Sequence, residues 1–332
     1  MEISEIFESF KNKTVFVVGD VMIDSYMWGK TERISPEAPV PVVTVMHKEN
    51  RMGGAANVGL NIKALGADAV LCAVIGNDPY GDIFRQLLAK RNMSDIGIFN
   101  TPDRPTTVKT RVIASSQHLL RVDEEVCSPI DENVSKKFIQ HTTRLIDMQN
   151  PDAIIFEDYD KGNITPEVIR AVVKKAKQLN IPVLVDPKKR NFFDYKGVTL
   201  FKPNFKELAE GMKISISKSD TDQVTDAANA LRQKLNADYV MVTLSEAGVL
   251  LVGENQVFSM PAQKREIADV SGAGDTVISV LACCFAANVD TRTSTVIANI
   301  AGGLVCENVG VVPIDKEQLL VESTRYFKAN SL

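Results

Sequence analysis

From about residue 130 onward, short apolar runs alternate with segments of helical periodicity, and this alternation restricts the possible folds more than any other feature. Three predicted helices are each followed by a predicted strand: 131–148 and 153–156, 165–179 and 183–185, 222–235 and 239–243. Near the N-terminus, the continuous apolar run Thr14–Gly19 is typical of a strand buried in a parallel sheet. Strands that alternate with helices predict an α/β fold of three layers, in which helices cover both faces of a mostly parallel central sheet.

Two stretches interrupt this alternation, at about 25–50 and 105–123. Three prolines in the first stretch argue against a helix there. The second predicts a hairpin of two β-rich runs across a short polar turn: Thr106–Ala114, Ser115, Ser116 and Gln117–Val122. We expect both stretches to form a small separate β-sheet that lies over the site as a lid, within one domain spanning residues 1–332.

Composition excludes several classes of protein. The chain has 24% charged residues and a net charge of −4, which argues against a nucleic-acid surface. The first ten residues lack the apolar core of a signal peptide, and no apolar run is long enough to span a membrane. The five cysteines form no CxxC pair and lie mostly in apolar context, as reduced thiols do. We expect a cytoplasmic protein with no nucleic-acid or membrane partner.

A glycine-rich turn, Asp269–Thr276, runs directly into an apolar helix. The unpaired N–H groups of a helix N-terminus bind anions, and the glycines allow a ligand to approach the backbone. A carboxylate beside a bound phosphate is electrostatically costly unless it takes part in chemistry. Asp275 is therefore a candidate general base for phosphoryl transfer to an alcohol, and an ordinary helix cap is the alternative. The turn is neither a Walker A loop nor a dinucleotide-binding fingerprint.

Small and polar residues also occur where a substrate would bind. Asp24 follows the first strand, and ligands bind at the carboxyl ends of strands in open α/β sheets. Gly53 and Gly54 open a helix that ends near Leu65, and Asn57 lies one turn into it. Asn57 is suited to a hydrogen bond with a sugar hydroxyl, although tight packing of the helix on the sheet would also explain these small residues.

Four later predicted strands are each followed by a segment with acid, amide, hydroxyl or lysine side chains: Glu157–Gly162, Asp186–Arg190, Lys202–Glu207 and Thr243–Gly248. We expect these segments to converge on the edge of the sheet that holds Asp275. Asn204 and Glu207 lie three residues apart at a helix start. An amide and a carboxylate suit Mg²⁺ held largely through waters and phosphate oxygens. A capping box is the alternative for this pair.

Together these motifs resemble the PfkB (ribokinase-like) sugar kinases over most of the chain. Met52–Asn57 through Gly81 is similar to the N-terminal signature of that family, and Asp269–Thr276 to its C-terminal signature. Two further segments, Gly19–Asp24 and Arg33–Val43, resemble the kinase half of the bifunctional heptose biosynthesis proteins. That resemblance implies ATP-dependent phosphorylation of D-glycero-β-D-manno-heptose 7-phosphate at O1 to the 1,7-bisphosphate, on the way to ADP-heptose for lipopolysaccharide.

The resemblance also implies roles for individual residues. Asp275 would be the base, and an anion hole would be formed by Gly272, Ala273 and Gly274. ATP and Mg²⁺ would be bound by Asn204 and Glu207, with the nucleotide cleft lined by Lys202, Thr243, Ser245 and Gly248. The sugar hydroxyls would be held by Asp24, Gly53, Gly54 and Asn57. In relatives the lid often forms a dimer interface, which implies a homodimer through the lid.

Three basic residues of the expected lid, Lys109, Arg111 and Arg121, form a hypothetical clamp for the phosphate already on the substrate. Ordinary surface charge is the alternative. The departures from the branch are Ser271 in place of a common Thr, and the carboxylates Glu157 and Asp160 where small or neutral residues are usual.

The nucleotidyltransferase half of the bifunctional proteins does not follow in the sequence. We therefore expect either that two chains divide the activities, or that the acceptor is another sugar or sugar phosphate, such as fructose 6-phosphate or ribose. A third possibility is a non-catalytic sugar or nucleotide sensor, against which the intact Gly272–Asp275 turn and the Asn204/Glu207 pair argue.

Overall fold

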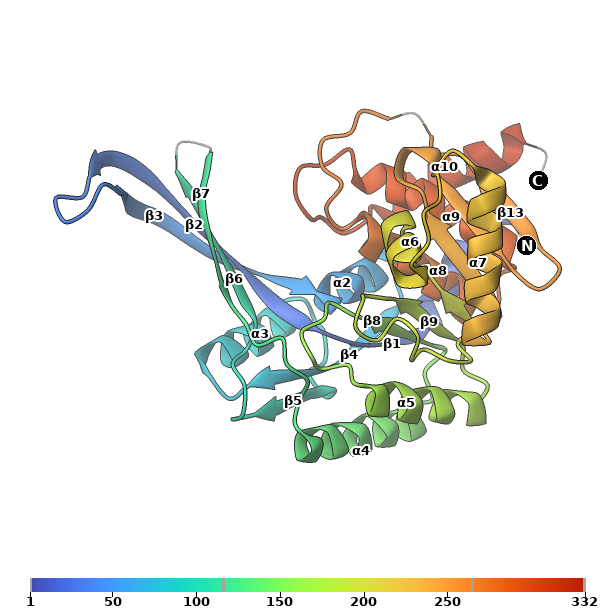
Figure 1. Cartoon of the computed structure of the whole chain (residues 1–332), viewed down its shortest axis with the longest axis horizontal. Helices are drawn as coiled ribbons and strands as arrows, with labels where there is room; N and C mark the ends of the chain where they lie inside the picture. The colour runs from blue at the N-terminus through green and yellow to red at the C-terminus, as the bar shows by residue number, and fades with distance from the viewer. Residues whose placement is uncertain (1, 115–116, 264, 331–332) are drawn as a thin grey trace.

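The computed structural model describes residues 2–114, 117–263 and 265–330, and its centre is a nine-stranded sheet (Figure 1). The strand order is β13-β12-β11-β10-β9-β8-β1-β4-β5. Pairing is parallel from β5 to β11, and only β12 and β13 run antiparallel to their neighbours. The strand bounds are Thr14–Gly19 (β1), Asp68–Gly76 (β4), Ile98–Thr101 (β5), Ala153–Glu157 (β8), Val183–Asp186 (β9), Leu200–Phe201 (β10), Tyr239–Thr243 (β11), Val249–Val252 (β12) and Val257–Met260 (β13).

Helices cover both faces of this sheet, because side chains of each strand alternate between two apolar cores. In β1, Val15 and Val17 belong to one core, while Phe16 and Val18 belong to the other. The first core is closed by α1 (Ile3–Ser9), α2 (Ala55–Leu65), α3 (Pro79–Lys90), α8 (Ala273–Ala286), α9 (Thr291–Val305) and α10 (Lys316–Ala329). The second is closed by α4 (Glu132–Gln149), α5 (Pro166–Gln178), α6 (Phe205–Met212) and α7 (Thr221–Leu235). The predicted three-layer α/β fold is confirmed.

A second sheet of four strands, which we call the lid sheet, extends away from the helices as a curved arm (Figure 1). Its strands are β2 (Val21–Ile34), β3 (Pro41–Gly54), β6 (Val108–Ala114) and β7 (Gln117–Glu124), in the order β3-β2-β6-β7. The predicted pairing of β6 with β7 is present, and the turn predicted at Ser115 and Ser116 lies outside the described residues. Since β2 starts two residues after β1 ends and β3 leads directly into α2, the lid sheet is rooted at the carboxyl edge of the central sheet.

The sequence patterns located some elements and missed others. Helix α2 begins after Gly54 and ends at Gly66, which adopts a left-handed φ of 99° as its C-cap. The N-terminal helix α1 and the short strand β5 were not predicted, because each is too short to show a clear period. Within the described ranges, no helix combines the length and the apolar character that a membrane crossing requires.

Candidate active site

The glycine-rich turn places Asp275 in the first turn of α8. Gly272 is the N-cap residue of the helix and has a left-handed φ of 80°, which a side chain at this position would strain. No side chain caps the helix, so Asp275, its third residue, does not act as a helix cap. The Ala273 N–H donates to the Val270 carbonyl at 3.3 Å. The N–H groups of Gly272, Gly274 and Asp275 find no acceptor among the described residues and are therefore available to an anion. Of the predicted anion hole, Ala273 alone has its N–H paired with a described residue.

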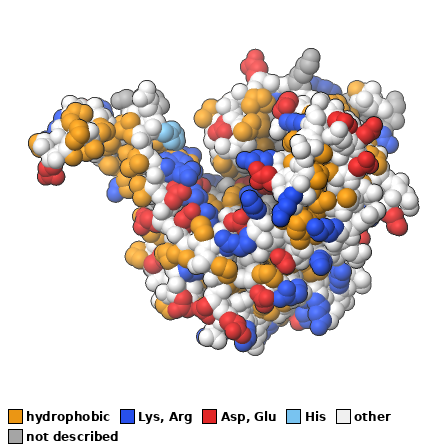
Figure 2. Space-filling model, viewed as in Figure 1, with side chains coloured by type: hydrophobic (Ala, Val, Ile, Leu, Met, Phe, Trp, Pro, Cys, Tyr) orange, Lys and Arg blue, Asp and Glu red, His pale blue; other side chains and the backbone are white. Residues whose placement is uncertain are grey.

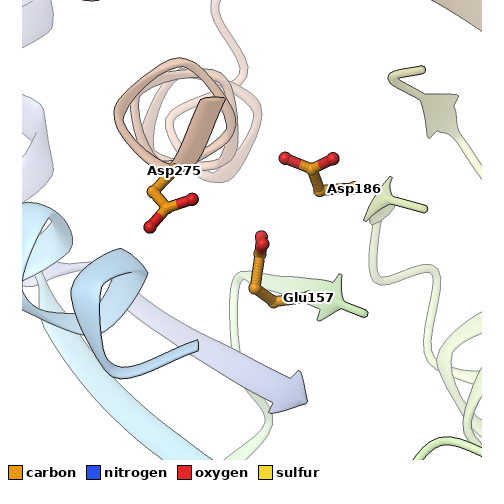
Figure 3. Close-up of side chains that lie close together, drawn as sticks. All are labelled: Glu157, Asp186 and Asp275. Atoms are coloured by element: carbon orange, nitrogen blue, oxygen red, sulfur yellow. The ribbon is translucent and has the colours of Figure 1, made fainter. Parts of the chain in front are cut away.

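Three buried carboxylates meet at this point (Figure 3). Glu157 ends β8, Asp186 ends β9 and Asp275 lies in α8, and each offers an oxygen within 4.8 Å of the others. Their exposed fractions are 1%, 6% and 6%. Lys202 supplies the nearby positive charge, since its buried ammonium lies 2.7 Å from Asp186 Oδ2. We call Glu157, Asp186 and Asp275 the carboxylate cluster.

Burial and mutual repulsion determine the protonation of the carboxylate cluster. Burial, followed by the charge of Asp186, raises the pKa of Asp275 to about 6, although hydrogen bonds from Tyr159 and Asn57 oppose this rise. Burial and the charges of Asp186 and Asp275 raise the pKa of Glu157 well above its usual value. Burial lowers the pKa of Lys202, but the contact with Asp186 more than offsets this and the net pKa is raised. Asp275 is thus ionised at neutral pH, as a general base requires.

A phenol orients Asp275. The Tyr159 hydroxyl donates to Asp275 Oδ1 at 2.9 Å. The loop carrying Tyr159 is held by Asp20, whose fully buried carboxylate accepts three backbone N–H groups, from Tyr159 (2.9 Å), Lys161 (3.1 Å) and Asn163 (3.1 Å). The geometry of the candidate base therefore depends on a residue at the end of β1, far from it in sequence.

Asn204 and Glu207 form a reciprocal capping box at the start of α6. Asn204 Oδ1 accepts from the Glu207 N–H and Glu207 Oε2 accepts from the Asn204 N–H, both at 2.8 Å. Glu207 Oε1 also accepts a hydrogen bond of 2.8 Å from the Lys188 ammonium. The capping alternative is therefore present, and any ligand contact by this pair would come in addition to it.

The other residues assigned to the nucleotide lie at the ends of neighbouring strands. Thr243 ends β11 and forms a parallel bridge with Asn204. Ser245 begins the short helical turn η2 (Ser245–Ala247) and Gly248 follows it, and both have positive φ angles, of 52° and 92°. Thr243 and Asn204 thus lie beside each other at the carboxyl edge of the sheet.

The residues assigned to the sugar gather at the root of the lid sheet. Gly54 requires glycine, because it has a φ of 61° and a Cβ there would collide with the Asp20 backbone carbonyl, whereas a Cβ on Gly53 would meet the carboxylate of Asp24. Asp24 and Asn57 line a cavity of about 670 Å³, a volume usual for small-molecule sites. Because the Asn57 amide lies close enough to Asp275 to lower the pKa of its carboxyl, this cavity adjoins the candidate base.

All three residues of the hypothetical phosphate clamp are paired with carboxylates. Lys109 lies 3.1 Å from Asp123 and 3.0 Å from Glu125, and Arg121 lies 2.9 Å from Asp123. Arg111 pairs with Asp24. These cations already have partners that an incoming phosphate would have to displace, and the clamp remains a prediction.

Sequence reasoning did not assign roles to Asp186 and Tyr159. Asp186 was visible as the acid directly after a predicted strand, the same signal that identified Glu157. The Tyr159 contact had no sequence signal, since 116 residues separate the two partners. Of the two unexpected acids, Glu157 enters the carboxylate cluster, whereas Asp160 adopts a left-handed turn in which its N–H donates to Asp158 Oδ1 at 2.8 Å.

Comparison with known proteins adds independent information. Residues 12–317 match the family model described as pfkB family carbohydrate kinase. Two curated relatives, each named bifunctional protein HldE, come from Helicobacter hepaticus (39% identical over 93% of this chain) and Citrifermentans bemidjiense (38% over 97%). The chain spans 64% and 65% of the length of these two relatives.

Solved structures show the same fold. Phosphofructokinase-2 from Escherichia coli, in complex with potassium, superimposes with a TM-score of 0.76 at 18% identity, covering 95% of this chain and 99% of that one. Arabidopsis thaliana ribokinase, complexed with ribose and ATP, gives a TM-score of 0.70 at 14% identity, covering 95% and 99%. At such identities the likeness extends to the fold alone.

The raised pKa of Glu157 leads to a prediction about stability. In the window from its usual value near 4.5 up to the raised value, the folded state binds the Glu157 proton more tightly than the unfolded state, so this group's contribution to stability falls as pH rises. Because glutamine does not titrate, Glu157→Gln removes this pH-dependent loss of folding stability. We expect the melting temperature of the variant, relative to the wild type, to increase between pH 5 and pH 8. Each tenfold difference in proton affinity corresponds to about 1.4 kcal/mol, or on the order of 2 °C.

Thermal unfolding in the presence of EDTA measures this difference without a metal contribution. Glu254→Gln, at an exposed position, is the matched control and should show no such trend. A constant difference between Glu157→Gln and the wild type across the pH range would show that Glu157 titrates normally.

Proposed function

The chain belongs to the pfkB family of carbohydrate kinases, and we propose that it phosphorylates D-glycero-β-D-manno-heptose 7-phosphate at O1 with ATP. The observation that carries the kinase part of this proposal is the setting of Asp275. Its carboxylate lies in the first turn of α8 beside free N–H groups, has a pKa of about 6, and lies near Asn57 in the wall of the 670 Å³ cavity. A base at an anion site, next to a pocket for a small polar acceptor, suits phosphoryl transfer to a hydroxyl.

The choice of heptose rests on sequence likeness. Gly19–Asp24 and Arg33–Val43 resemble the kinase half of the bifunctional heptose biosynthesis proteins. The HldE relatives match 93% and 97% of this chain, so their similarity is not confined to the two signatures. Fructose 6-phosphate and ribose remain the alternative acceptors, and the first would make this protein similar in activity as well as in fold to phosphofructokinase-2.

In the proposed mechanism, Asp275 accepts the proton of the attacking hydroxyl while Tyr159 holds its other oxygen in place. The N–H groups of Gly272, Gly274 and Asp275 stabilise the negative charge that develops on the transferred phosphoryl group. Asp24 and Asn57 orient the acceptor, and the glycines at positions 53 and 54 let it approach the backbone. The lid sheet would exclude water, which would otherwise compete as acceptor.

Magnesium fits this site by the chemistry of its donors. Glu157 Oε2 is buried without a hydrogen-bond partner among the described residues, and it points into a group of oxygen ligands of the kind that hard divalent cations prefer. Glu157 and Asp186 would hold the ion directly, and Asn204 and Glu207 would reach it through waters. When bound, Mg²⁺ neutralises phosphate charge during transfer.

ATP turnover against a panel of acceptors tests the proposed function. The panel comprises heptose 7-phosphate, fructose 6-phosphate, ribose and fructose, each with Mg²⁺. We expect selective turnover of heptose 7-phosphate, with the new phosphate on the anomeric oxygen. Turnover of another sugar alone would retain the kinase and reject heptose, and no turnover of any acceptor would favour the sensor.

Removing the candidate base has a defined expected effect. Asp275→Asn retains the shape of the side chain but cannot accept the proton, so kcat should fall by roughly 10²–10⁴-fold. The Kd for ATP should change little, which equilibrium titration of the nucleotide measures. A near-normal kcat in this variant would show that another group is the base.

The pH dependence of the reaction follows from the pKa of Asp275. Because the base must be ionised, kcat/KM should fall as pH drops through about 6. Tyr159→Phe removes a hydrogen bond that favours the ionised form, so the acid limb of the profile should move to higher pH. An unshifted limb, measured over pH 5–9, would mean that Tyr159 does not contact Asp275 during turnover.

We also propose that two copies of the chain associate through their lid sheets. Large apolar side chains of the lid sheet are exposed, among them Ile34 (63%), Met46 (67%) and Leu120 (58%), and Figure 2 shows apolar side chains gathered on the projecting arm. Contiguous exposed apolar surface is typical of protein interfaces. A second copy would bury this surface and keep the lid sheet over the acceptor.

Light scattering coupled to size-exclusion chromatography measures the association. The wild type should elute as a dimer, and Leu120→Glu should elute as a monomer. Met148→Glu is the matched control, since Met148 is 65% exposed on α4 of the core and should not affect association. A monomeric wild type at micromolar concentration would contradict the proposed dimer.

A further inference from the structure

The acceptor cavity has wall residues that the proposed mechanism does not use. Besides Asp24 and Asn57, its walls include Leu60 of α2, the residues Lys90 and Arg91 at the end of α3, and the loop 311–313. Asn57 ties the cavity to the candidate base, because its amide lies close enough to Asp275 to lower the pKa of that carboxyl. The cavity wall thus combines a carboxylate and an amide with two further basic residues.

The charges of the cavity walls cancel except at Lys90 and Arg91. Asp24 pairs with Arg111, and Glu49 with Arg51 through two hydrogen bonds of 2.8 Å. Lys90 and Arg91 have no carboxylate within ion-pair distance among the described residues. Two positive charges therefore remain in the cavity wall, and they match the charge of a phosphate monoester dianion.

We propose that Lys90 and Arg91 bind the phosphate group that the acceptor sugar already carries. This inference rests on the proposed function, because it assumes that the cavity holds the acceptor. The sugar ring would lie along the wall formed by Leu60 and the loop 311–313, with its reactive hydroxyl toward Asp24 and Asn57. An Arg guanidinium binds phosphate with two parallel hydrogen bonds, and a Lys ammonium adds a point charge.

The three basic residues of the lid sheet are less suited to this role. Lys109 and Arg121 are held by Asp123 and Glu125, so a phosphate binding there would meet two carboxylates at close range. At the end of α3 no carboxylate of the described residues pairs with Lys90 or Arg91, so an approaching phosphate there meets only the weaker negative end of the helix dipole. Cations also complement the dipole at a helix C-terminus, and the experiment has to distinguish that structural role from phosphate binding.

Steady-state kinetics of Lys90→Ala/Arg91→Ala separate these roles. We expect KM for heptose 7-phosphate, or for whichever sugar phosphate the wild type uses, to rise about tenfold or more, with kcat and the KM for ATP unchanged. Lys90→Arg should retain a KM near that of the wild type. Lys137→Ala/Arg144→Ala is the matched control, since both residues are exposed cations of α4, outside the cavity lining.

The outcomes distinguish this inference from the proposed function. An active wild type whose KM for the sugar phosphate is the same in the double variant would overturn the phosphate subsite and leave the kinase intact. If no sugar phosphate is turned over, calorimetric titration with heptose 7-phosphate and fructose 6-phosphate compares the affinity of the wild type and the double variant for the sugar phosphate. Binding that weakens about tenfold in the double variant would still support the subsite, and equal or absent binding in both proteins would overturn it.

Discussion

The burial of three carboxylates with one buried ammonium is the constraint on which the rest of this structure depends. Glu157, Asp186 and Asp275 approach one another out of water, and among the described residues their charge is offset by the buried Lys202 and by the half-buried Lys188. Isolated ionised groups are costly in such surroundings, so the carboxylate cluster must gain a proton, a cation or a phosphate-bound metal to become favourable. This unfavourable cluster lies at the carboxyl edge of the sheet, where α8 contacts β8 and β9.

Asp20 connects the two sides of the candidate site. Its side chain accepts three N–H groups from the loop that carries Tyr159, and its backbone carbonyl accepts the Ala55 N–H at the start of α2 at 3.0 Å. One buried residue at the end of β1 therefore positions both the phenol that holds Asp275 and the helix that presents Asn57. The full burial of Asp20 is explained by these four hydrogen bonds, because they replace the water that its polar groups lose.

Charge pairing divides the basic residues around the acceptor cavity into two groups. Those of the lid sheet and its root are neutralised by Asp24, Glu49, Asp123 and Glu125, and they stabilise the arm of long strands. Lys90 and Arg91 come from the end of α3, outside the lid sheet, and have no carboxylate partner among the described residues. A substrate phosphate held by core residues would leave the lid sheet free to open without releasing it.

The sequence by itself determined the fold class, the lid strands, the candidate base and the convergence of the strand ends, because each depends on local periodicity or on a motif that is continuous in the chain. Tertiary structure alone decided the rest. It made Glu157 part of the carboxylate cluster and excluded Asp160, brought Tyr159 to Asp275 across 116 residues, and paired Lys109, Arg111 and Arg121 with carboxylates of the lid sheet. The charge and hydrogen bonding of a side chain depend on neighbours distant in sequence, and only the packing of the two sheets brings these neighbours together.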